Sequence, residues 1–229
     1  MKSVCIIIPV KDEEKGLQFL YDDFTNSNIK NLFDISFIFV IDERTSDSSK
    51  EVASLFSTKI IDQKETQGKG SAVREAVDMW KNNQTDFIIF LDADGSYSFN
   101  DVFTILKSLS EVNEVVSGSR FLNINSHPMG MSKLHIFGNK VLSKVSSIKN
   151  KNNITDLCTG LWGFNRFALN KLSLNANGFD LEAELAGKSR KEGLNHIEVQ
   201  VNWSARKGGF SKIRSFRDGF IILLRILRT

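Results

Sequence analysis

Prolines, cysteines and long apolar runs are scarce in this chain of 229 residues, which contains two prolines and two cysteines. With so few prolines, no low-complexity tract and no internal repeat, we expect neither long linkers nor a repeat architecture. No apolar run approaches the roughly 20 residues of a membrane-spanning helix, and the run Val4–Ile8 is too short for a signal peptide. Cys5 and Cys158 lie in apolar stretches without metal-ligand spacing, which predicts core residues of a protein from a reducing compartment.

Charged residues are abundant but unevenly distributed. The chain is 41% hydrophobic and 25% charged with a net charge of +3, which is typical of a single globular domain. From Ser204 onward, seven Lys and Arg residues against the single acid Asp218 give +6, so the first 203 residues carry −3. The basic end predicts an anionic partner, by default a phosphate group or a membrane surface. We expect no nucleic-acid partner.

Short apolar runs alternate with amphipathic stretches through the first half of the chain. Such runs suit strands that are buried on both faces, and the stretches between them suit helices. The alternation predicts an α/β fold with a mostly parallel, Rossmann-like central sheet flanked by helices. The predicted strands are Val4–Ile8, Ser36–Ile41, Lys59–Ile61, Phe87–Leu91 and Glu114–Ser117.

The second half of the chain is less regular. The predicted elements are a helix at Lys133–Val145, an exposed loop at Ser146–Asn153, a helix at Leu181–Lys191, a strand at Ile197–Trp203 and a last helix at Phe216–Leu227.

Two carboxylates follow the apolar run Phe87–Leu91. Asp92 and Asp94 are two residues apart, so they point the same way along an extended chain, at the end of a strand where open α/β sheets bind ligands. Because like charges repel, the pair suits a divalent cation that holds phosphate oxygens. Taken alone, however, the pattern favours a solvated turn that caps the next helix, with Gly95 and Ser96 as turn residues.

Other chemistry-bearing residues follow other predicted strands. Glu13 and Asp42 come after the first two, and in a doubly wound sheet these ends lie side by side. Acids there suit hydrogen bonds to a nucleobase and to ribose hydroxyls. A predicted tight turn at Gln67–Gly70 adds a flexible backbone and the cation of Lys69, although it matches neither a dinucleotide-binding nor a Walker A pattern.

Seven short segments, spread over nearly the whole chain, carry polar or glycine motifs: Ile8–Glu14, Val40–Asp47, Asp92–Gly95, Gly118–Arg120, Asp156–Arg166, Gly178–Glu184 and Arg206–Lys212. Each is weak alone. Together they resemble the motifs of the family 2 glycosyltransferases of GT-A fold, in particular the dolichol-phosphate and other polyprenyl-phosphate mannosyl- and glucosyltransferases. Asp12 stands where the family has Asn, and Glu43 and Arg44 stand where it has Asp and Gly.

The resemblance implies an inverting, metal-dependent hexosyltransferase. A hexose, mannose or glucose, would pass from a GDP- or UDP-linked donor (GDP-mannose or UDP-glucose) to a polyprenyl or dolichyl phosphate. Residues 1–229 would form one domain, with a nucleotide-sugar-binding half (1–120), an acceptor-binding half (121–213) and an amphipathic helix (214–229). A phosphate acceptor is already anionic at neutral pH and needs little general-base help. A sugar-hydroxyl acceptor would need a base, for which Asp156, Asp180 and Glu182 are the candidates.

The resemblance also implies roles for individual residues. Asp94, helped by Asp92, would hold Mg²⁺ or Mn²⁺. Arg120, Arg206 and Lys212 would hold phosphates and, with Asp94, form the catalytic set. The donor pocket would further include Pro9, Lys11, Glu13, Val40, Asp42, Lys69, Gly95, Ser96 and Ser211. Together with the acids at the earlier strand ends, these motifs reverse the interpretation of Asp92 and Asp94, from a capped turn to a metal site.

The last predicted helix has two distinct faces. One carries Arg214, Arg217, Ile221, Arg225 and Arg228, and the other carries Phe216, Phe220, Leu223, Leu224 and Leu227. Such a helix can lie on the cytoplasmic face of an anionic membrane, which would make the protein cytoplasmic and peripherally membrane-bound. It can equally pack on its own domain with a solvated arginine face.

Two other functional classes were weighed. A haloacid-dehalogenase-type phosphatase also has Asp-x-Asp-Gly after an apolar strand, but on the first core strand and with a downstream acidic pair, and neither condition holds here. A non-catalytic nucleotide-sugar-binding domain is the other alternative.

Overall fold

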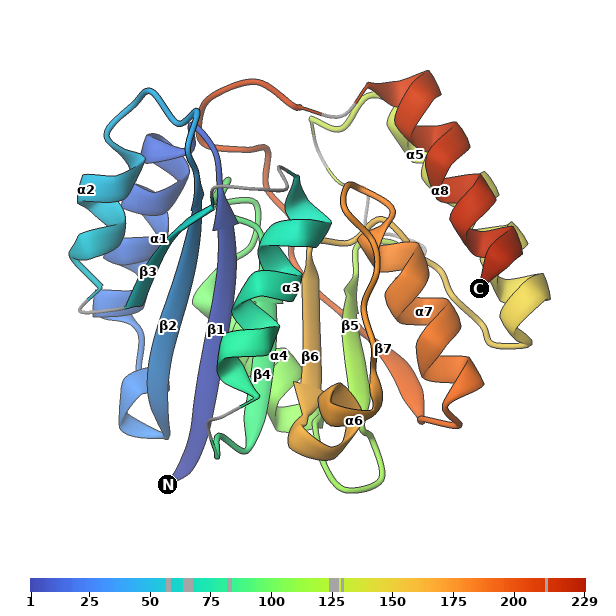
Figure 1. Cartoon of the computed structure of the whole chain (residues 1–229), viewed down its shortest axis with the longest axis horizontal. Coiled ribbons are helices and arrows are strands. Elements are labelled where there is room, and N and C mark those ends of the chain that lie inside the picture. The colour runs from blue at the N-terminus through green and yellow to red at the C-terminus, as the bar shows by residue number, and fades with distance from the viewer. Residues whose placement is uncertain (57–58, 64–67, 82–83, 124–127, 129, 213) are drawn as a thin grey trace.

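The computed structural model describes the whole chain except residues 57–58, 64–67, 82–83, 124–127, 129 and 213. Within this part of the chain, seven strands form one sheet in the order β3-β2-β1-β4-β6-β5-β7 (Figure 1). The strands are β1 (Lys2–Val10), β2 (Phe33–Asp42), β3 (Lys59–Gln63), β4 (Phe87–Leu91), β5 (Val115–Ser119), β6 (Leu161–Asn165) and β7 (His196–Gln200).

Helices cover both faces of the sheet, as Figure 1 shows for α3 in front and α4 behind. The α-helices are α1 (Glu14–Asn26), α2 (Ser49–Ser54), α3 (Lys69–Trp80), α4 (Phe99–Ser108), α5 (Lys133–Asn150), α6 (Arg166–Lys171), α7 (Leu181–Lys191) and α8 (Ser215–Arg228), and a 3₁₀ turn spans Ile29–Asn31. Among these, no helix has the length and apolar character needed to cross a bilayer.

The alternation of side chains along β1 explains the two-faced core. Val4, Ile6 and Ile8 pack with α1, α2 and α4, whereas Cys5 and Ile7 pack on the opposite face with α3 and α7. Each such side chain is fully or almost fully buried, and each contributes roughly 1.5–3 kcal/mol to folding. The predicted α/β architecture with a mostly parallel central sheet is therefore confirmed.

One strand breaks the parallel pattern. β6 lies between β4 and β5 and runs antiparallel to both. Gly163 lets it sit close to α4, because a Cβ there would come within 2.3 Å of Ile105 Cγ2. The alternation of apolar runs contained no sign of this reversal, since a chain can enter a sheet in either direction with the same burial.

The boundaries of two predicted elements were wrong. The loop predicted at Ser146–Asn153 is helical as far as Asn150, and Lys151 caps α5 in the left-handed conformation at φ 49°. Ser146 and Asn150 are buried, and Asn150 Nδ2 donates to Ser146 Oγ at 3.0 Å, so polar residues satisfy one another on the inner face of the helix. β7 ends at Gln200, three residues before the predicted end. The predicted turn beginning at Gln67 lies partly outside the described residues.

Candidate active site

A cavity of about 630 Å³ opens at the carboxyl ends of β1, β2 and β4, at the upper edge of the sheet in Figure 1. The predicted meeting of strand ends is found here, because Glu13, Asp42, Asp92 and Asp94 all line this one cavity. Its wall contains Pro9, Val10, Lys11, Glu13, Asp42, Arg44, Gln63, Gly68, Lys69, Ala72, Asp92, Ala93, Asp94, Gly178, Phe179, Arg206, Ser211, Lys212 and Arg214.

The turn after β4 directs its carboxylates to this cavity. Asp94 Oδ1 accepts a hydrogen bond from Ser96 N at 2.9 Å, and Gly95 between them has φ +72°, where a Cβ would lie 2.7 Å from Lys207 Cγ. The next helix has its own cap, since the Ser98 side chain and Asp101 form a capping box at the start of α4. Asp92 and Asp94 are therefore not the capping residues of α4, although Asp94 does hold the turn that precedes this helix.

Glu13 holds two cations of the C-terminal segment over the strand ends. Its Oε1 accepts from Arg206 Nη2 at 2.6 Å and from Lys212 Nζ at 2.5 Å. Arg206 Nη2 also lies 3.7 Å from Asp94 Oδ2. Burial raises the pKa of Glu13 above its ordinary value, although Lys212 and Arg206 oppose this shift. The arrangement gathers two cations on Glu13 and places one of them, Arg206, beside Asp94.

Asp42 at the end of β2 is held by cations on both sides. Arg44 Nη2 lies 2.8 Å from Asp42 Oδ2 and Lys11 Nζ lies 3.6 Å from the same oxygen. The Arg44 hydrogen bond holds the pKa of Asp42 below its ordinary value. Arg44 is one of the departures from the family motif, and it covers the carboxylate that the resemblance assigns to the nucleoside.

Lys69, the first residue of α3, lies between two carboxylates. Its Nζ is 2.6 Å from Asp92 Oδ1 and 2.5 Å from Glu182 Oε1. Burial alone would lower the pKa of Lys69, but the two carboxylates raise it above its ordinary value. Burial raises the pKa of both acids, and Lys69 opposes that shift.

Four of the predicted site residues lie elsewhere. Val40 is fully buried in the core. Gly95 and Ser96 form the turn that follows Asp94 and are not among the residues that line the cavity. The Arg120 guanidinium is buried, with Nε and Nη2 each 2.6 Å from the carboxylate of Asp156 and Nη2 2.9 Å from the backbone oxygen of Cys158. This position suits a residue that holds the loop before β6, not one whose guanidinium reaches a ligand in the cavity.

That loop supports Asp92 directly. Asp92 N donates to Gly160 O at 3.1 Å, and a Cβ on Gly160 would lie only 1.9 Å from Asp92 Oδ2. Only glycine leaves room there for the carboxylate, which gives a physical reason for the glycine that ends the segment Asp156–Gly160.

The residues to which the sequence interpretation gave no place in the pocket include Gln63, Phe179 and Arg214, which line the cavity, and Glu182 was not paired with Lys69. Gln63 is the last residue of β3, so the rule that placed acids at strand ends could have found it. The pairing of Glu182 with Lys69 joins segments 113 positions apart and has no local signal.

The carboxylates of the cavity suit a divalent cation that takes some of its ligands from the protein and others from a bound phosphate. In the described part of the chain, no group of three or more His, Cys, Asp or Glu could hold a metal by itself. Asp92 and Asp94 both line the cavity, and Mg²⁺ is commonly bound by one or two carboxylates together with substrate phosphates and water. The two carboxylates therefore fit a metal whose remaining ligands are water or the phosphate oxygens of a bound diphosphate.

Solved structures of other proteins share this fold. Glucosyl-3-phosphoglycerate synthase from Mycobacterium tuberculosis, solved with Mn²⁺, UDP and glucosyl-3-phosphoglycerate, superposes with a TM-score of 0.76 at 14% identity, covering 99% of this chain and 79% of that one. At this identity the likeness establishes the GT-A fold alone.

Three curated relatives match more than nine tenths of the chain. Glycosyltransferase AglJ of Haloferax volcanii is 28% identical over 227 residues, 99% of this chain and 71% of AglJ. The UDP-N-acetylglucosamine–dolichyl-phosphate N-acetylglucosaminyltransferase of Methanococcus voltae is 24% identical over 246 residues, covering 99% and 95%. The polyprenol monophosphomannose synthase of Mycolicibacterium smegmatis is 21% identical over 221 residues, covering 91% and 80%.

The family model named Glycosyl transferase family 2 matches residues 5–173, which contain most of β1 and all of β2 to β6. The match covers more than half of the chain and contains Glu13, Asp42, Asp92 and Asp94 of the cavity. The chain therefore belongs to glycosyl transferase family 2 and is a glycosyltransferase of GT-A fold.

Proposed function

We propose that this glycosyltransferase moves a hexose, with inversion, from a nucleotide-sugar donor to a polyprenyl phosphate, and that it requires a divalent cation. Relatives named for dolichyl-phosphate and polyprenol substrates support the acceptor class. The named donor sugars of these relatives differ, so the proposal includes both GDP- and UDP-linked donors, with Mg²⁺ or Mn²⁺ at Asp92 and Asp94. In this proposal residues 1–120 mainly bind the donor and 121–213 the acceptor.

The observation that carries the choice of a phosphate acceptor is that each candidate general base is already paired with a cation. Asp156 is fully buried against Arg120. Asp180 Oδ2 lies 2.6 Å from Arg225 Nη2, and Glu182 pairs with Lys69. A hydroxyl acceptor needs a base within hydrogen-bond reach of its proton. A phosphate, whose second pKa is about 6, does not.

The residues of the cavity suit catalysis by positioning and electrostatics. Arg206 and Lys212, anchored on Glu13, would orient two anions: the diphosphate of the donor and the phosphate of the acceptor. An oxygen of the acceptor phosphate then attacks the anomeric carbon, and the bond to the diphosphate breaks on the opposite face, which inverts the centre. When bound, the divalent cation supplies charge neutralisation on the leaving diphosphate.

We further propose that α8, with α5 beside it, rests on the cytoplasmic face of a membrane. The inner face of α8 is Ile222 and Ile226, which are buried, and Arg225 also points inward to Asp180. Its outer face carries Phe216, which is 84% exposed, and Phe220, which is 62% exposed. α8 thus packs on its own domain with Arg217 and Arg228 exposed, and large apolar side chains are exposed beside these arginines.

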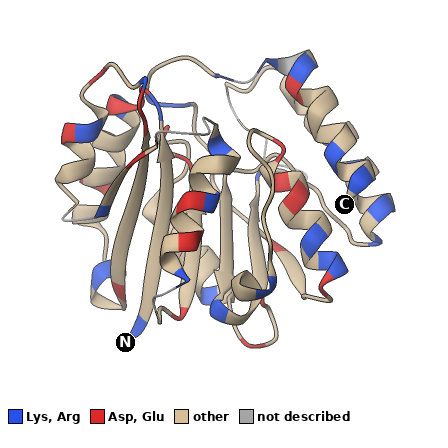
Figure 2. Ribbon diagram, in the orientation of Figure 1, with Lys and Arg blue, Asp and Glu red and all other residues tan. Residues whose placement is uncertain are grey.

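α5 extends this apolar surface. Lys149 Nζ donates to Leu227 O at 3.3 Å, which joins the two helices, and Figure 1 shows them side by side. Phe137 and Ile148 on α5 are 68% and 69% exposed. α5 contains four lysines and no acid, and Figure 2 shows Lys and Arg spread along both helices. Exposed aromatic residues flanked by cations suit an anionic lipid surface.

The proposed reaction is tested by incubating the protein with Mn²⁺ and, in turn, GDP-mannose, UDP-glucose and UDP-N-acetylglucosamine, each with a polyprenyl phosphate. The expected product is a polyprenyl phosphate carrying one sugar, detected by mass spectrometry of the lipid extract. The matched control acceptor is the polyprenol without its phosphate, which should remain unmodified. Transfer to the polyprenol instead, or to neither lipid, would contradict the proposal.

A further inference from the structure

One largely buried cation in the cavity, Lys69, contacts two carboxylates at once. Lys69 Nζ contacts Asp92 Oδ1 and Glu182 Oε1 at nearly equal distances, 2.6 and 2.5 Å. Asp92 follows β4, whereas Glu182 lies in the first turn of α7. The side chains of Lys69 and Glu182 are 15% and 9% exposed, and that of Asp92 is 32% exposed. Asp92 is thus the partner that a ligand entering the cavity can reach most easily.

The backbone that carries Lys69 is fixed. A Cβ on Gly68, where φ is +138°, would lie 2.4 Å from Asn177 O, and one on Gly70 would lie 2.6 Å from Ala176 O. Ser71 N also donates to Asn177 O at 3.1 Å. The two turns pack closely against each other, so rotation of the Lys69 side chain is the simplest movement by which Nζ leaves one carboxylate.

A divalent cation at Asp92 would compete with Lys69 for the same carboxylate. Two cations on one carboxylate repel each other, because both would lie within a few ångströms of the same oxygens. The repulsion is relieved when Lys69 leaves Asp92, but a buried ammonium without a partner would be costly. A second carboxylate on the far side of Lys69 removes that cost, because the ammonium keeps an ion pair. Glu182 is in that position.

We propose that Lys69 is a built-in cation that occupies Asp92 in the absence of metal, and that Glu182 is the partner that retains Lys69 when a divalent cation takes Asp92. Glu182 is then a positioning residue that acts through Lys69. The inference rests on the proposed function only in its assumption that Asp92 and Asp94 hold the cation.

The proposal predicts opposite effects of two near-isosteric substitutions on the binding of Mn²⁺ alone, measured from the free Mn²⁺ signal in electron paramagnetic resonance. Lys69→Gln should tighten Mn²⁺ binding, because the competitor is gone. Glu182→Gln should weaken it by roughly tenfold, since Lys69 is then left without a second partner.

The double variant decides between this exchange and a simple field effect. If Glu182 acted only as a nearby negative charge, its replacement would weaken Mn²⁺ binding equally with and without Lys69. The exchange predicts that Glu182→Gln costs little, less than about twofold, in the Lys69→Gln background. Equal losses in both backgrounds, or an unaltered protein that binds no Mn²⁺, would overturn the proposal.

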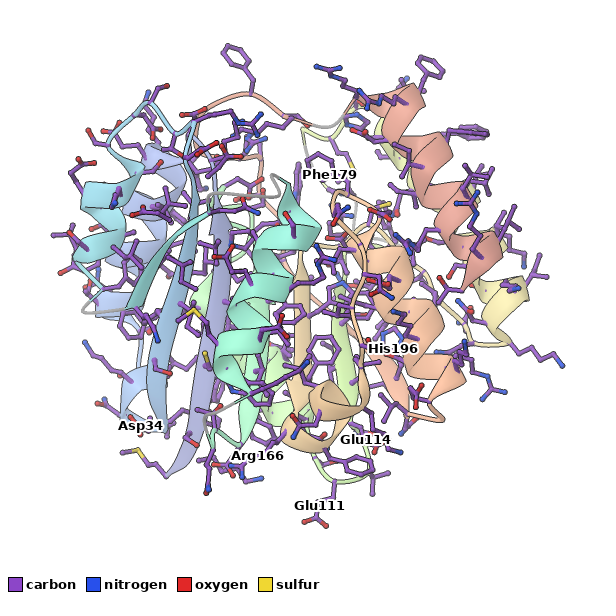
Figure 3. The ribbon with its side chains drawn as sticks, viewed as in Figure 1. Asp34, Glu111, Glu114, Arg166, Phe179 and His196 are labelled. Atoms are coloured by element: carbon purple, nitrogen blue, oxygen red, sulfur yellow. The ribbon has the colours of Figure 1, made fainter. Side chains whose placement is uncertain are left out.

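The control variant is Glu111→Gln. Glu111 is exposed and lies at the opposite end of the molecule from Phe179 of the cavity wall (Figure 3), so its replacement should not change Mn²⁺ binding. The titration contains neither sugar donor nor lipid. A failed transfer assay therefore leaves the Lys69 exchange intact, and a failed exchange leaves the reaction class intact.

Discussion

Glu13 and Arg206 are 193 positions apart in the sequence and are joined by a hydrogen bond of 2.6 Å between Glu13 Oε1 and Arg206 Nη2. Lys212 Nζ donates to the same oxygen. One carboxylate after β1 therefore holds two cations of the C-terminal segment at the cavity, and one of them, Arg206, lies 3.7 Å from Asp94 Oδ2. The basic end of the chain thus contributes Arg206, Lys212 and Arg214 to the wall of the cavity.

This anchoring predicts how the loss of one cation changes the KM for each of the two substrates. Arg206→Ala and Lys212→Ala should each raise the KM for polyprenyl phosphate more than the KM for the nucleotide sugar, with a loss of roughly tenfold or more in kcat/KM. Initial rates with each substrate varied in turn measure this split. An unchanged acceptor KM would contradict the assigned role. Arg190→Ala, on the exposed end of α7, is the matched control.

Asp94→Asn should abolish sugar transfer while leaving the fold intact. The amide keeps the hydrogen bond that Ser96 N donates to Oδ1 at 2.9 Å, but it lacks the charge that a divalent cation requires. Transfer rates should fall by at least about a hundredfold, and the melting temperature should stay within a few degrees of the unaltered protein. Near-normal turnover would show that Asp94 is not a metal ligand.

The sequence was sufficient for those parts of the fold and site that depend on local pattern. Strand ends could be located because the apolar runs stop at Pro9, Asp42 and Asp92, and the parallel order then places these ends together. The reversal of β6 and the helical course of Ser146–Asn150 have no local signature, since both depend on partners distant in sequence or on polar groups that satisfy one another when buried.

The role of Arg120 shows the same limit at the level of one side chain. A motif marks the residue as necessary, but a phosphate ligand and a buried anchor both favour arginine. Only the positions of Asp156 and Cys158, 36 and 38 residues later, decide in favour of the anchor.

Gly160 and Gly138 form a matched pair for testing the support of Asp92. Gly160→Ala would put a Cβ 1.9 Å from Asp92 Oδ2, whereas a Cβ on Gly138 meets nothing within 4 Å. Gly160→Ala should therefore lower transfer by at least about tenfold through displacement of the carboxylate. Gly138→Ala, inside α5, should keep full activity and raise the unfolding free energy by roughly 0.5–1 kcal/mol. Denaturant titrations and transfer rates measure both, and equal activity of the two variants would refute the close fit at Gly160.

His196 predicts a loss of stability in acid. Burial lowers its pKa to about 4, and its Nε2 shares a hydrogen bond of 2.8 Å with Ser117 Oγ. In the unfolded chain the imidazole binds a proton near pH 6.5, whereas in the folded protein it stays neutral down to about pH 4. Above pH 6.5 the free energy of unfolding is therefore not reduced by His196. As the pH falls from 6.5 towards 4, it declines by roughly 3 kcal/mol in total. His196→Gln should remove this part of the pH dependence. The difference in unfolding free energy between the two proteins, measured from pH 7 to pH 4, isolates it from the other acids, and a constant difference would contradict the prediction.

The outer faces of α5 and α8 predict binding to anionic vesicles. A variant that combines Phe216→Ser with Phe220→Ser, and a separate Phe137→Ser variant, should each weaken co-sedimentation, the double variant by roughly tenfold or more, because each phenylalanine that enters the interface contributes about 1.5–3 kcal/mol. Val112→Ser is the control, since Val112 is 73% exposed outside these helices. Binding of the unaltered protein should fall as salt is raised, because the flanking cations act through a screened potential. A short, water-soluble acceptor phosphate should be glycosylated equally by all of these proteins, since none of the substitutions lies in the cavity. If the phenylalanine variants bind vesicles like the control, or if sedimentation velocity shows that this face instead joins two copies of the chain, the membrane assignment is wrong.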